Sequence, residues 1–216
     1  MTAVSILILG LLLGMKHATE ADHLAAVATL AARQASLAQT LRQGLAWGVG
    51  HTLTLLLFGG AVFVLGQAIS PTLEQALETG VGVMLVLLGA DLLRRVLRER
   101  IRVRLHPHAP PTRWPLRALV VGAMHGLAGS AALVMLSLQG LPSVSLGLGY
   151  IAVFGLGSIV GMAALSVVIA MPLRFSATYL VGLHRSMTAL VGAFSIGLGI
   201  YLVIRIGYLQ AHWPGA

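Results

Sequence analysis

Long apolar stretches, separated by short polar segments, follow one another along almost the whole chain. A transmembrane helix needs roughly 20 mostly apolar residues to cross about 30 Å of hydrocarbon. Six stretches of this length occur, over residues 2–30, 41–69, 73–96, 116–138, 144–171 and 179–204. We therefore predict an all-α, polytopic membrane protein with about six transmembrane helices in one domain over residues 1–216. The first stretch has no basic start and no small-residue cleavage site, which indicates a retained span rather than a secretory signal.

The composition agrees with a protein whose main solvent is lipid. Hydrophobic residues make up 57% of the chain and charged residues 9%, and the mean hydropathy is +0.92. In soluble domains about a quarter of the residues are charged. The chain has no cysteine, which excludes disulfides, thiolate metal sites and thiol redox chemistry. Any metal ligands must be histidine, carboxylate, methionine or backbone groups.

The net charge of +8 is explained by membrane topology and predicts no nucleic-acid partner. Cytoplasmic loops of membrane proteins are enriched in lysine and arginine. The chain concentrates basic residues in one segment, which we expect to face the cytoplasm: Arg94, Arg95, Arg98, Arg100, Arg102, Arg104, Arg113 and Arg117.

This orientation fixes the expected side of every other connection. The other basic connections, which carry Arg33, Arg42, Arg174 and Arg185, then also face inside. The connection with Glu74 and Glu78, residues 139–145 and both chain termini face outside. We expect a multi-pass protein of a cell inner membrane with lipid around it, and the sequence carries no signal for an oligomeric state.

A weak internal similarity divides the chain into two halves. Three pairs of segments match at offsets of about 107 to 110 residues: 14–17 with 123–125, 48–51 with 155–158, and 82–89 with 192–199. We therefore predict a first repeat over about 1–97, a cytoplasmic basic loop over about 98–115, and a second repeat over about 116–206. A three-span unit repeated in tandem has opposite orientations in the membrane, and such inverted repeats place their substrate site near the midplane.

Polar residues interrupt the first apolar stretch. The segment Lys16-His17-Ala18-Thr19-Glu20-Ala21-Asp22-His23 contains five ionisable groups, and each charge at a bilayer centre costs roughly 2.5 to 3.5 kcal/mol. Two further histidines, His51 and His125, lie about ten residues inside their own spans. Imidazole and carboxylate together suit nickel, cobalt, zinc and iron. The predicted metal site is His17, Asp22, His23, His51 and His125.

One regular helix cannot direct the first three of these side chains to one point. At about 100° per residue, His17 and Asp22 are separated by about 140° around the helix axis. A single helix over 2–30 would also be about 43 Å long, longer than the hydrocarbon core. We therefore predict that the first helix is broken in this segment, or that one of the three residues orients a ligand from outside the metal's own shell.

Other polar residues have simpler interpretations. Lys16 and Glu20 stand at i and i+4 and are expected to pair with each other. His184 is expected to be an ordinary hydrogen-bonded residue. His106 and His108, in the basic loop, either capture metal at the cytoplasmic mouth or belong to a solvated linker; the linker is the stronger interpretation.

The segment Gly14 to His23 resembles the signature of the nickel/cobalt transporter family, whose members share a His-x4-Asp-His motif in an early helix. Gly50-His51-Thr52 resembles the family's second, Gly-His-Ser/Thr element. The segment Met124-His125-Gly126-Leu127-Ala128-Gly129-Ser130-Ala131-Ala132 is similar to its short, urease-accessory-like members. The resemblance implies high-affinity transport of Ni²⁺ or Co²⁺, with the first motif required for metal recognition. The longer members have eight spans and a large internal loop, and arginine is common where this chain has Lys16, so the ion and the direction stay open.

The combined hypothesis is uptake of a divalent transition-metal ion, Ni²⁺ or Co²⁺ first, through a His/Asp site at the midplane. The protein would not be an enzyme, and it would need no cofactor beyond the transported ion. One alternative is a membrane haem or electron-transfer protein, in which His51 and His125 ligate iron. Another is an exporter of a small solute built on the same repeat plan.

Overall fold

A computed structural model describes residues 2–34, 36–66, 70–102, 115–128 and 143–209. Within these ranges all regular structure is helical and no strand occurs, which confirms the all-α prediction. The elements are α1 (Ala3–His17), α2 (Ala21–Ala31), α3 (Leu37–Thr54), η1 (Leu55–Gly59), α4 (Gly60–Leu65), α5 (Pro71–Arg102), α6 (Leu116–Leu127), α8 (Val144–Tyr179), α9 (Val181–Leu202) and η2 (Val203–Leu209), where η denotes a π-helix.

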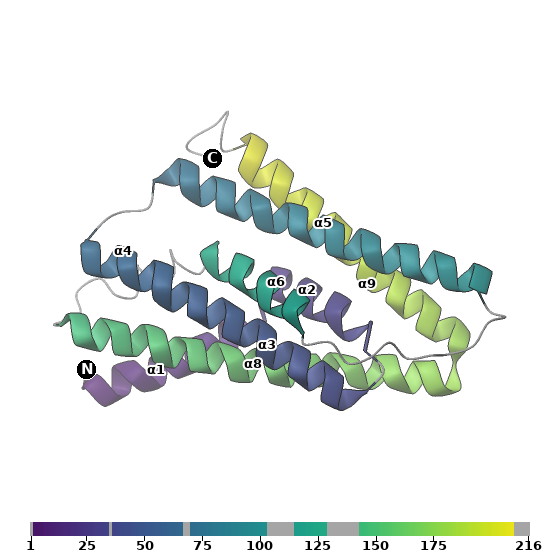
Figure 1. Ribbon diagram of the computed structural model, residues 1–216, viewed down its shortest axis with the longest axis horizontal. Coiled ribbons are helices and arrows are strands. Elements are labelled where there is room, and N and C mark those ends of the chain that lie inside the picture. Colours follow the sequence, from purple (N-terminus) through teal and green to yellow (C-terminus); the bar gives the residue numbers. More distant parts are fainter. Residues whose placement is uncertain (1, 35, 67–69, 103–114, 129–142, 210–216) are drawn as a thin grey trace.

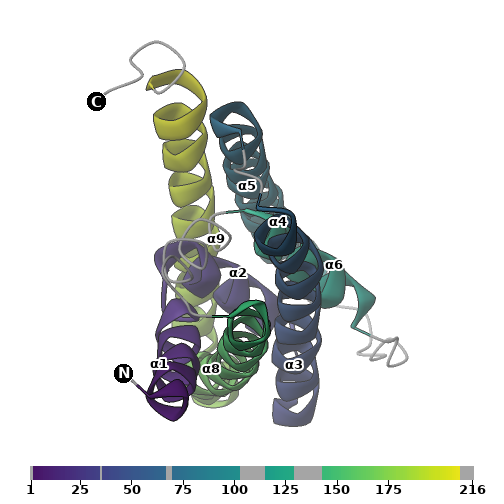
Figure 2. The ribbon, with the colours of Figure 1, turned by 90° about the vertical axis from the view of Figure 1, so that its left-hand side faces the viewer.

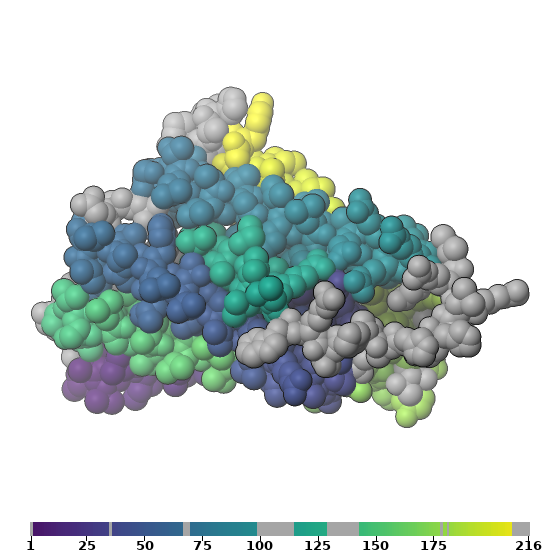
Figure 3. All heavy atoms as spheres, viewed as in Figure 1, coloured from purple at the N-terminus to yellow at the C-terminus, as the bar shows by residue number. Residues whose placement is uncertain are grey.

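The helices form two groups with shorter helices between them. Helices α1, α8 and α3 lie side by side, and α5 packs against α9 on the opposite side of the molecule (Figures 1 and 2). Helix α2 lies between these groups and contacts α8, α9 and α5. Helix α6 packs along α3, and Figure 3 shows it on the surface between α3 and α5. The arrangement places the short helix α2 at the centre of the fold and the short helix α6 against the outer side of α3.

Several helices are long and apolar enough to span a membrane. Four single spans cover Leu37–Leu65, Pro71–Arg98, Val144–Ala177 and Gly182–Tyr208, and the bent pair α1 and α2 provides a fifth. The chain is thus a multi-pass membrane protein. The fourth predicted span, over 116–138, is described only as the 12-residue helix α6, and residues 129–142 lie outside the described part. Five of the six predicted spans are therefore present in the described residues.

The distribution of side chains follows from lipid on the outside and close packing inside. Large apolar side chains such as Leu12, Leu87 and Leu190 are exposed on the outer surface. Every residue of α2 from Ala25 to Ala31 is buried. A helix that is apolar on all sides must be covered on all sides, and the four alanines of this segment let neighbouring helices approach closely.

Glycines allow backbones to touch at the helix crossings. A Cβ atom added to Gly14 of α1 would lie 2.0 Å from the carbonyl oxygen of Phe154 in α8. A Cβ atom added to Gly122 of α6 would lie 2.1 Å from the carbonyl oxygen of Trp47 in α3. No side chain fits at either position, so these crossings depend on glycine.

Two boundaries differ from the sequence prediction. Helix α5 begins at Pro71, two residues before the predicted start of this span at residue 73, so that Glu74 and Glu78, which we also assigned to the outer connection, belong to the helix. The side chain of Ser70 accepts a hydrogen bond from the main-chain N–H of Leu73, and proline at the first helical position suits a helix start. Helix α8 continues through Pro172 to Tyr179, although we predicted that the span ends at residue 171.

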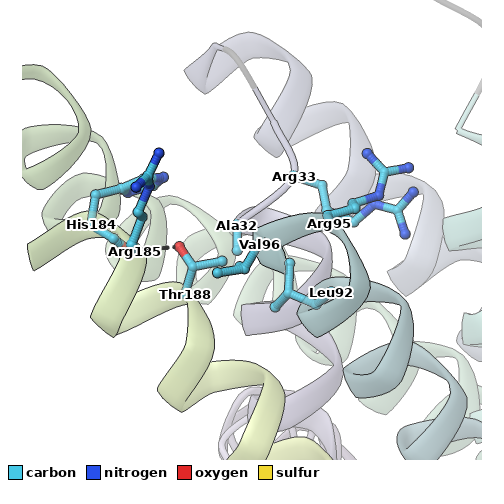
Figure 4. Close-up of a pocket in the computed structure, with 8 residues that line it drawn as sticks. All are labelled: Ala32, Arg33, Leu92, Arg95, Val96, His184, Arg185 and Thr188. Carbon is cyan, nitrogen blue, oxygen red and sulfur yellow. Dashed lines mark hydrogen bonds between the residues drawn. The ribbon is translucent and has the colours of Figure 1, made fainter. Parts of the chain in front are cut away.

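An ion cluster lies far from the start of α5. Asp91 of α5 accepts hydrogen bonds from Arg33, which follows α2, and from Arg117 of α6, and Arg95 lies 4.0 Å away. Beside this cluster is a cavity of about 100 Å³ between α5 and α9. Figure 4 shows Arg33 and Arg95 on one side of this cavity and Arg185 on the other. The cluster connects three parts of the fold at its arginine-rich end.

Candidate metal site

The first long apolar stretch is divided into two helices at the polar segment. Helix α1 ends at His17 and α2 begins at Ala21, with an angle of 59° between their axes. The Thr19 hydroxyl donates to a carbonyl of the last turn of α1 at 2.6 Å, and Glu20 has extended backbone geometry that redirects the chain. Asp22 then stands in the first turn of α2, where a negative charge is favourable. The predicted break in this helix is confirmed.

Four histidine side chains from four helices converge at this break. The ring centre of His17, at the end of α1, lies 4.4 Å from that of His23 and 5.3 Å from that of His51. The ring of His23, in α2, lies 5.4 Å from His51 of α3 and 4.5 Å from His125 of α6. All four residues are between 0% and 4% exposed. The structure therefore brings the predicted histidines together in one buried cluster.

Asp22 holds two of these imidazoles in place. One carboxylate oxygen lies 3.1 Å from Nδ1 of His23, and the other lies 3.0 Å from Nε2 of His125. A carboxylate accepts hydrogen bonds, so both nitrogens carry the proton when these bonds form. Nε2 of His23 and Nδ1 of His125 are then the unprotonated nitrogens, and their lone pairs are available to bind metal.

Glu20 lies beside a third imidazole. Its carboxylate is 2.9 Å from Nδ1 of His17, an ion-pair contact whose geometry is not that of a hydrogen bond. Within the described chain no ion pair joins Glu20 to Lys16, whose side chain is exposed. The predicted pairing of Lys16 with Glu20 is therefore replaced by a contact between Glu20 and His17.

Several nitrogens of the cluster have no protein partner. Among the described residues, both ring nitrogens of His17 and of His51, Nε2 of His23 and Nδ1 of His125 are buried without a hydrogen bond. A buried polar atom without a partner costs about 1 to 3 kcal/mol. Their concentration in one place makes the cluster the candidate binding site of the described residues.

The donor atoms are spaced almost closely enough for a single ion. Two groups of three, His17 with His23 and His51, and Asp22 with His23 and His125, each have ligand atoms within 4.8 Å of one another. Around a tetrahedral ion with bonds of about 2.05 Å, ligand atoms lie about 3.3 Å apart. A movement of about an ångström would complete either group, and His23 belongs to both.

Trp47 forms one wall of the cluster and was missed by the sequence analysis. Its indole is fully buried, stacks on the ring of His23 at 5.6 Å and meets the ring of His125 edge-on at 5.6 Å. The signal was its spacing, because Trp47 and His51 stand at i and i+4 on one face of α3. The π-helix η1 begins at Leu55, one turn after His51, and such π-turns often occur at functional sites.

A cavity of about 300 Å³ leads to the cluster. His17, Asp22, His23 and His125 line it, whereas His51 does not and lies fully buried. The remaining lining consists of two acidic residues and four apolar ones: Glu20, Glu78, Val81, Ala128, Leu202 and Ile206. Glu78 was missed as a site residue because its charge placed it in a connection between spans.

His184, the remaining histidine of the described residues, lies outside this cluster. Nδ1 of His184 lies 3.0 Å from the carbonyl oxygen of Leu173 and 3.4 Å from the hydroxyl of Ser176, as expected for an ordinary hydrogen-bonded residue. His106 and His108 lie outside the described residues, so their predicted roles stay predictions.

One protein of known name is similar along almost the entire chain. The identity is 35% over 215 residues to the urease accessory protein UreH of Bacillus sp. (strain TB-90), and the alignment covers 96% of this chain and 94% of that protein. No family profile matches the chain, and no solved structure matches it significantly. The similarity therefore concerns the chain as a whole rather than one segment of it.

Proposed function

The chain belongs to the nickel/cobalt transporter family, among its members of the UreH type, and from this premise we propose that it carries Ni²⁺ or Co²⁺ into the cell through the histidine cluster. The named relative is an accessory protein of urease rather than the urease itself, and this chain likewise is not an enzyme. The transported ion is its substrate, and no cofactor is required.

One observation carries the proposal: buried imidazoles from four helices meet at a helix break and retain free nitrogens. Neutral imidazole suits nickel and cobalt. A haem protein is less well supported, because Asp22 occupies Nε2 of His125, one of the two predicted iron ligands. An exporter of organic solutes would have no need for so many free imidazole nitrogens.

The ligands divide into two kinds in this proposal. His17, His23 and His51 supply nitrogen ligands, and Asp22 orients His23 from behind, as carboxylates commonly do for metal-binding histidines. Asp22 with His23 and His125 offers a second position nearer the cavity. Because His23 is common to both groups, an ion can pass from one to the other while it keeps one ligand.

The glycine contacts support two inverted repeats. A Cβ added to Gly50 would lie 2.2 Å from the carbonyl oxygen of Leu119, and one added to Gly157 would lie 2.2 Å from that of Leu11. Each residue of the second contact stands about 108 residues from its counterpart in the first. The contact between α3 and α6 thus repeats between α8 and α1, with the halves exchanged, which is what a two-fold axis between inverted repeats produces.

The two ends of the molecule differ in a way that fits alternating access. The cavity is lined by Glu78, near the start of α5, and by Ile206, in the middle of η2, at the end that we assign to the outside. Asp91 and its arginines lie at the opposite, arginine-rich end. This arrangement corresponds to an outward-facing state in which the ion reaches the cluster from outside, and rocking of the two halves opens the inner end.

The test is nickel accumulation in cells that express single variants. His17→Ala, His23→Ala and His51→Ala should each reduce accumulation to the level of cells without the protein, because each removes a ligand. His184→Ala is the matched control, since it removes a partly buried histidine outside the cluster. Protein abundance in the membrane is measured alongside. Normal accumulation by the cluster variants at equal abundance would exclude these residues from transport.

A further inference from the structure

Glu78 is a half-buried carboxylate without a partner. It lies in the second turn of α5 and lines the cavity. Among the described residues its carboxylate makes no hydrogen bond or ion pair, and its nearest charged neighbours include the acidic Glu74 and Asp22. Arg205 is the cation whose charge reaches it, but that guanidinium donates to the Tyr201 hydroxyl at 3.3 Å. Among the described residues, no cation therefore directly neutralises the carboxylate of Glu78.

An uncompensated carboxylate within a membrane protein is costly and marks an ion pathway. Here it shares its cavity with Glu20 and with His23, whose buried Nε2 has no hydrogen-bond partner. Walls of low polarity, made by Val81, Leu202 and Ile206, concentrate the field of the carboxylates within the cavity. The cavity is thus a negatively charged approach to a set of free imidazole nitrogens.

The size of the cavity fits a cation that still carries its water. A water molecule takes about 30 Å³ in the liquid, so the six waters of a hydrated divalent ion occupy about 180 Å³. The cavity holds about 300 Å³, which leaves room for such an ion between the carboxylates and the imidazoles.

We infer that Glu78 and Glu20 form a capture site that holds the hydrated divalent cation through its water ligands before the imidazoles replace that water. This inference rests on the proposed function and adds a separate first step to it. Carboxylates attract a divalent ion whatever its ligand preference, whereas imidazoles select nickel and cobalt. Capture therefore sets the concentration at which transport is half-maximal, and the histidine cluster sets which ion passes.

Magnesium separates the two steps. Mg²⁺ prefers oxygen ligands and gives up its water reluctantly, so it competes for the capture site but not for the histidine cluster. Mg²⁺ at millimolar concentration should thus inhibit nickel uptake competitively in the unaltered protein.

The experiment measures initial rates of nickel uptake in proteoliposomes for Glu78→Gln, Glu78→Asp and Glu74→Gln. Glu74 is the matched control, because it lies one turn earlier in the same helix and does not line the cavity. Glu78→Gln should raise KM about five- to tenfold with the maximal rate within about twofold, and should lose most of the inhibition by Mg²⁺. Glu78→Asp should restore both properties in part, and Glu74→Gln should behave as the unaltered protein.

The outcomes distinguish this inference from the proposed function. If His23→Ala abolishes uptake while Glu78→Gln keeps the KM and the Mg²⁺ inhibition of the unaltered protein, the transport function stands and the capture site is wrong. An equal rise in KM for Glu74→Gln would show that the change in KM comes from surface charge in general, and would overturn the capture site as well. If neither His23→Ala nor Glu78→Gln affects nickel uptake, the proposed function itself fails.

Discussion

Asp22→Asn tests the division between ligands and the residue that orients them. Asp22 accepts hydrogen bonds from His23 at 3.1 Å and from His125 at 3.0 Å. Asparagine has nearly the same shape, but its amide has one acceptor oxygen and one donor nitrogen. It can therefore preserve one of these bonds, whereas the other imidazole must change its tautomer or lose its partner.

The expected loss of Ni²⁺ affinity follows from the hydrogen bond that the substitution removes. Removal of an outer partner of a metal-binding histidine typically weakens metal affinity about 10- to 100-fold, which corresponds to about 1.4 to 2.7 kcal/mol. Because asparagine retains one of the two hydrogen bonds, we expect the loss of Ni²⁺ affinity in Asp22→Asn to stay within this range. His23→Ala should bind more weakly still, since it removes a ligand that belongs to both groups of three.

The measurement is a nickel titration of purified protein against a chelator of known affinity, with Glu74→Gln as an acidic control outside the cavity. An unchanged Kd for Asp22→Asn would refute the orienting role. A loss as large as that of His23→Ala would also refute the orienting role, because Asp22 would then serve the group of His17, His23 and His51 as a ligand rather than orient His23 within it.

Three further predictions concern packing, the ion cluster and pH. Gly126→Ala places a Cβ atom 2.4 Å from the carbonyl oxygen of His51, whereas a Cβ atom at Gly80 meets nothing within 4 Å. Gly126→Ala should therefore lower the free energy of unfolding by about 1 to 3 kcal/mol, with Gly80→Ala as the control. Equal thermal midpoints for Gly126→Ala and Gly80→Ala would contradict the close contact between α3 and α6. Asp91→Asn removes the negative charge that Arg33 and Arg117 share and should lower the free energy of unfolding by about 1 kcal/mol, less at high salt; a thermal midpoint unchanged at low salt would argue against the cluster as a stabilising contact. Nickel binding should weaken as pH falls, because protons compete for the imidazoles; calorimetry in buffers of different ionisation enthalpy measures the released protons, and release of none would be incompatible with imidazole ligands.

Much of the candidate site could be predicted from the depth of its residues within their spans and from helix geometry. His51 and His125 were placed with the first cluster because they lie similarly far inside their spans, and the structure brings their rings to within 5.4 Å and 4.5 Å of His23. The break after His17 followed from the helical period, which cannot direct His17 and Asp22 to one point. Periodicity and span length are local properties, so they can be determined from a sequence.

The remaining features depend on contacts between helices. Glu78 was assigned to a connection because a charge near the end of an apolar stretch usually marks a boundary, and only the packing of α5 against α9 brings it to the cavity. Glu20 was paired with Lys16 by spacing along one helix, a rule that fails once the helix ends between them at His17. Trp47 becomes a wall of the site only through the placement of α2 against α3.

The bend between α1 and α2 gives the two ends of the polar segment different neighbours. His17 ends a helix that packs along α8, and His23 lies in the first turn of a helix that packs largely against α9 and α8. The separation of their rings therefore depends on the angle between α1 and α2. In the proposed function, an ion bound by both imidazoles would fix the angle between α1 and α2. A change in this angle would separate the two rings and release the ion, so binding and release would depend on the same bend.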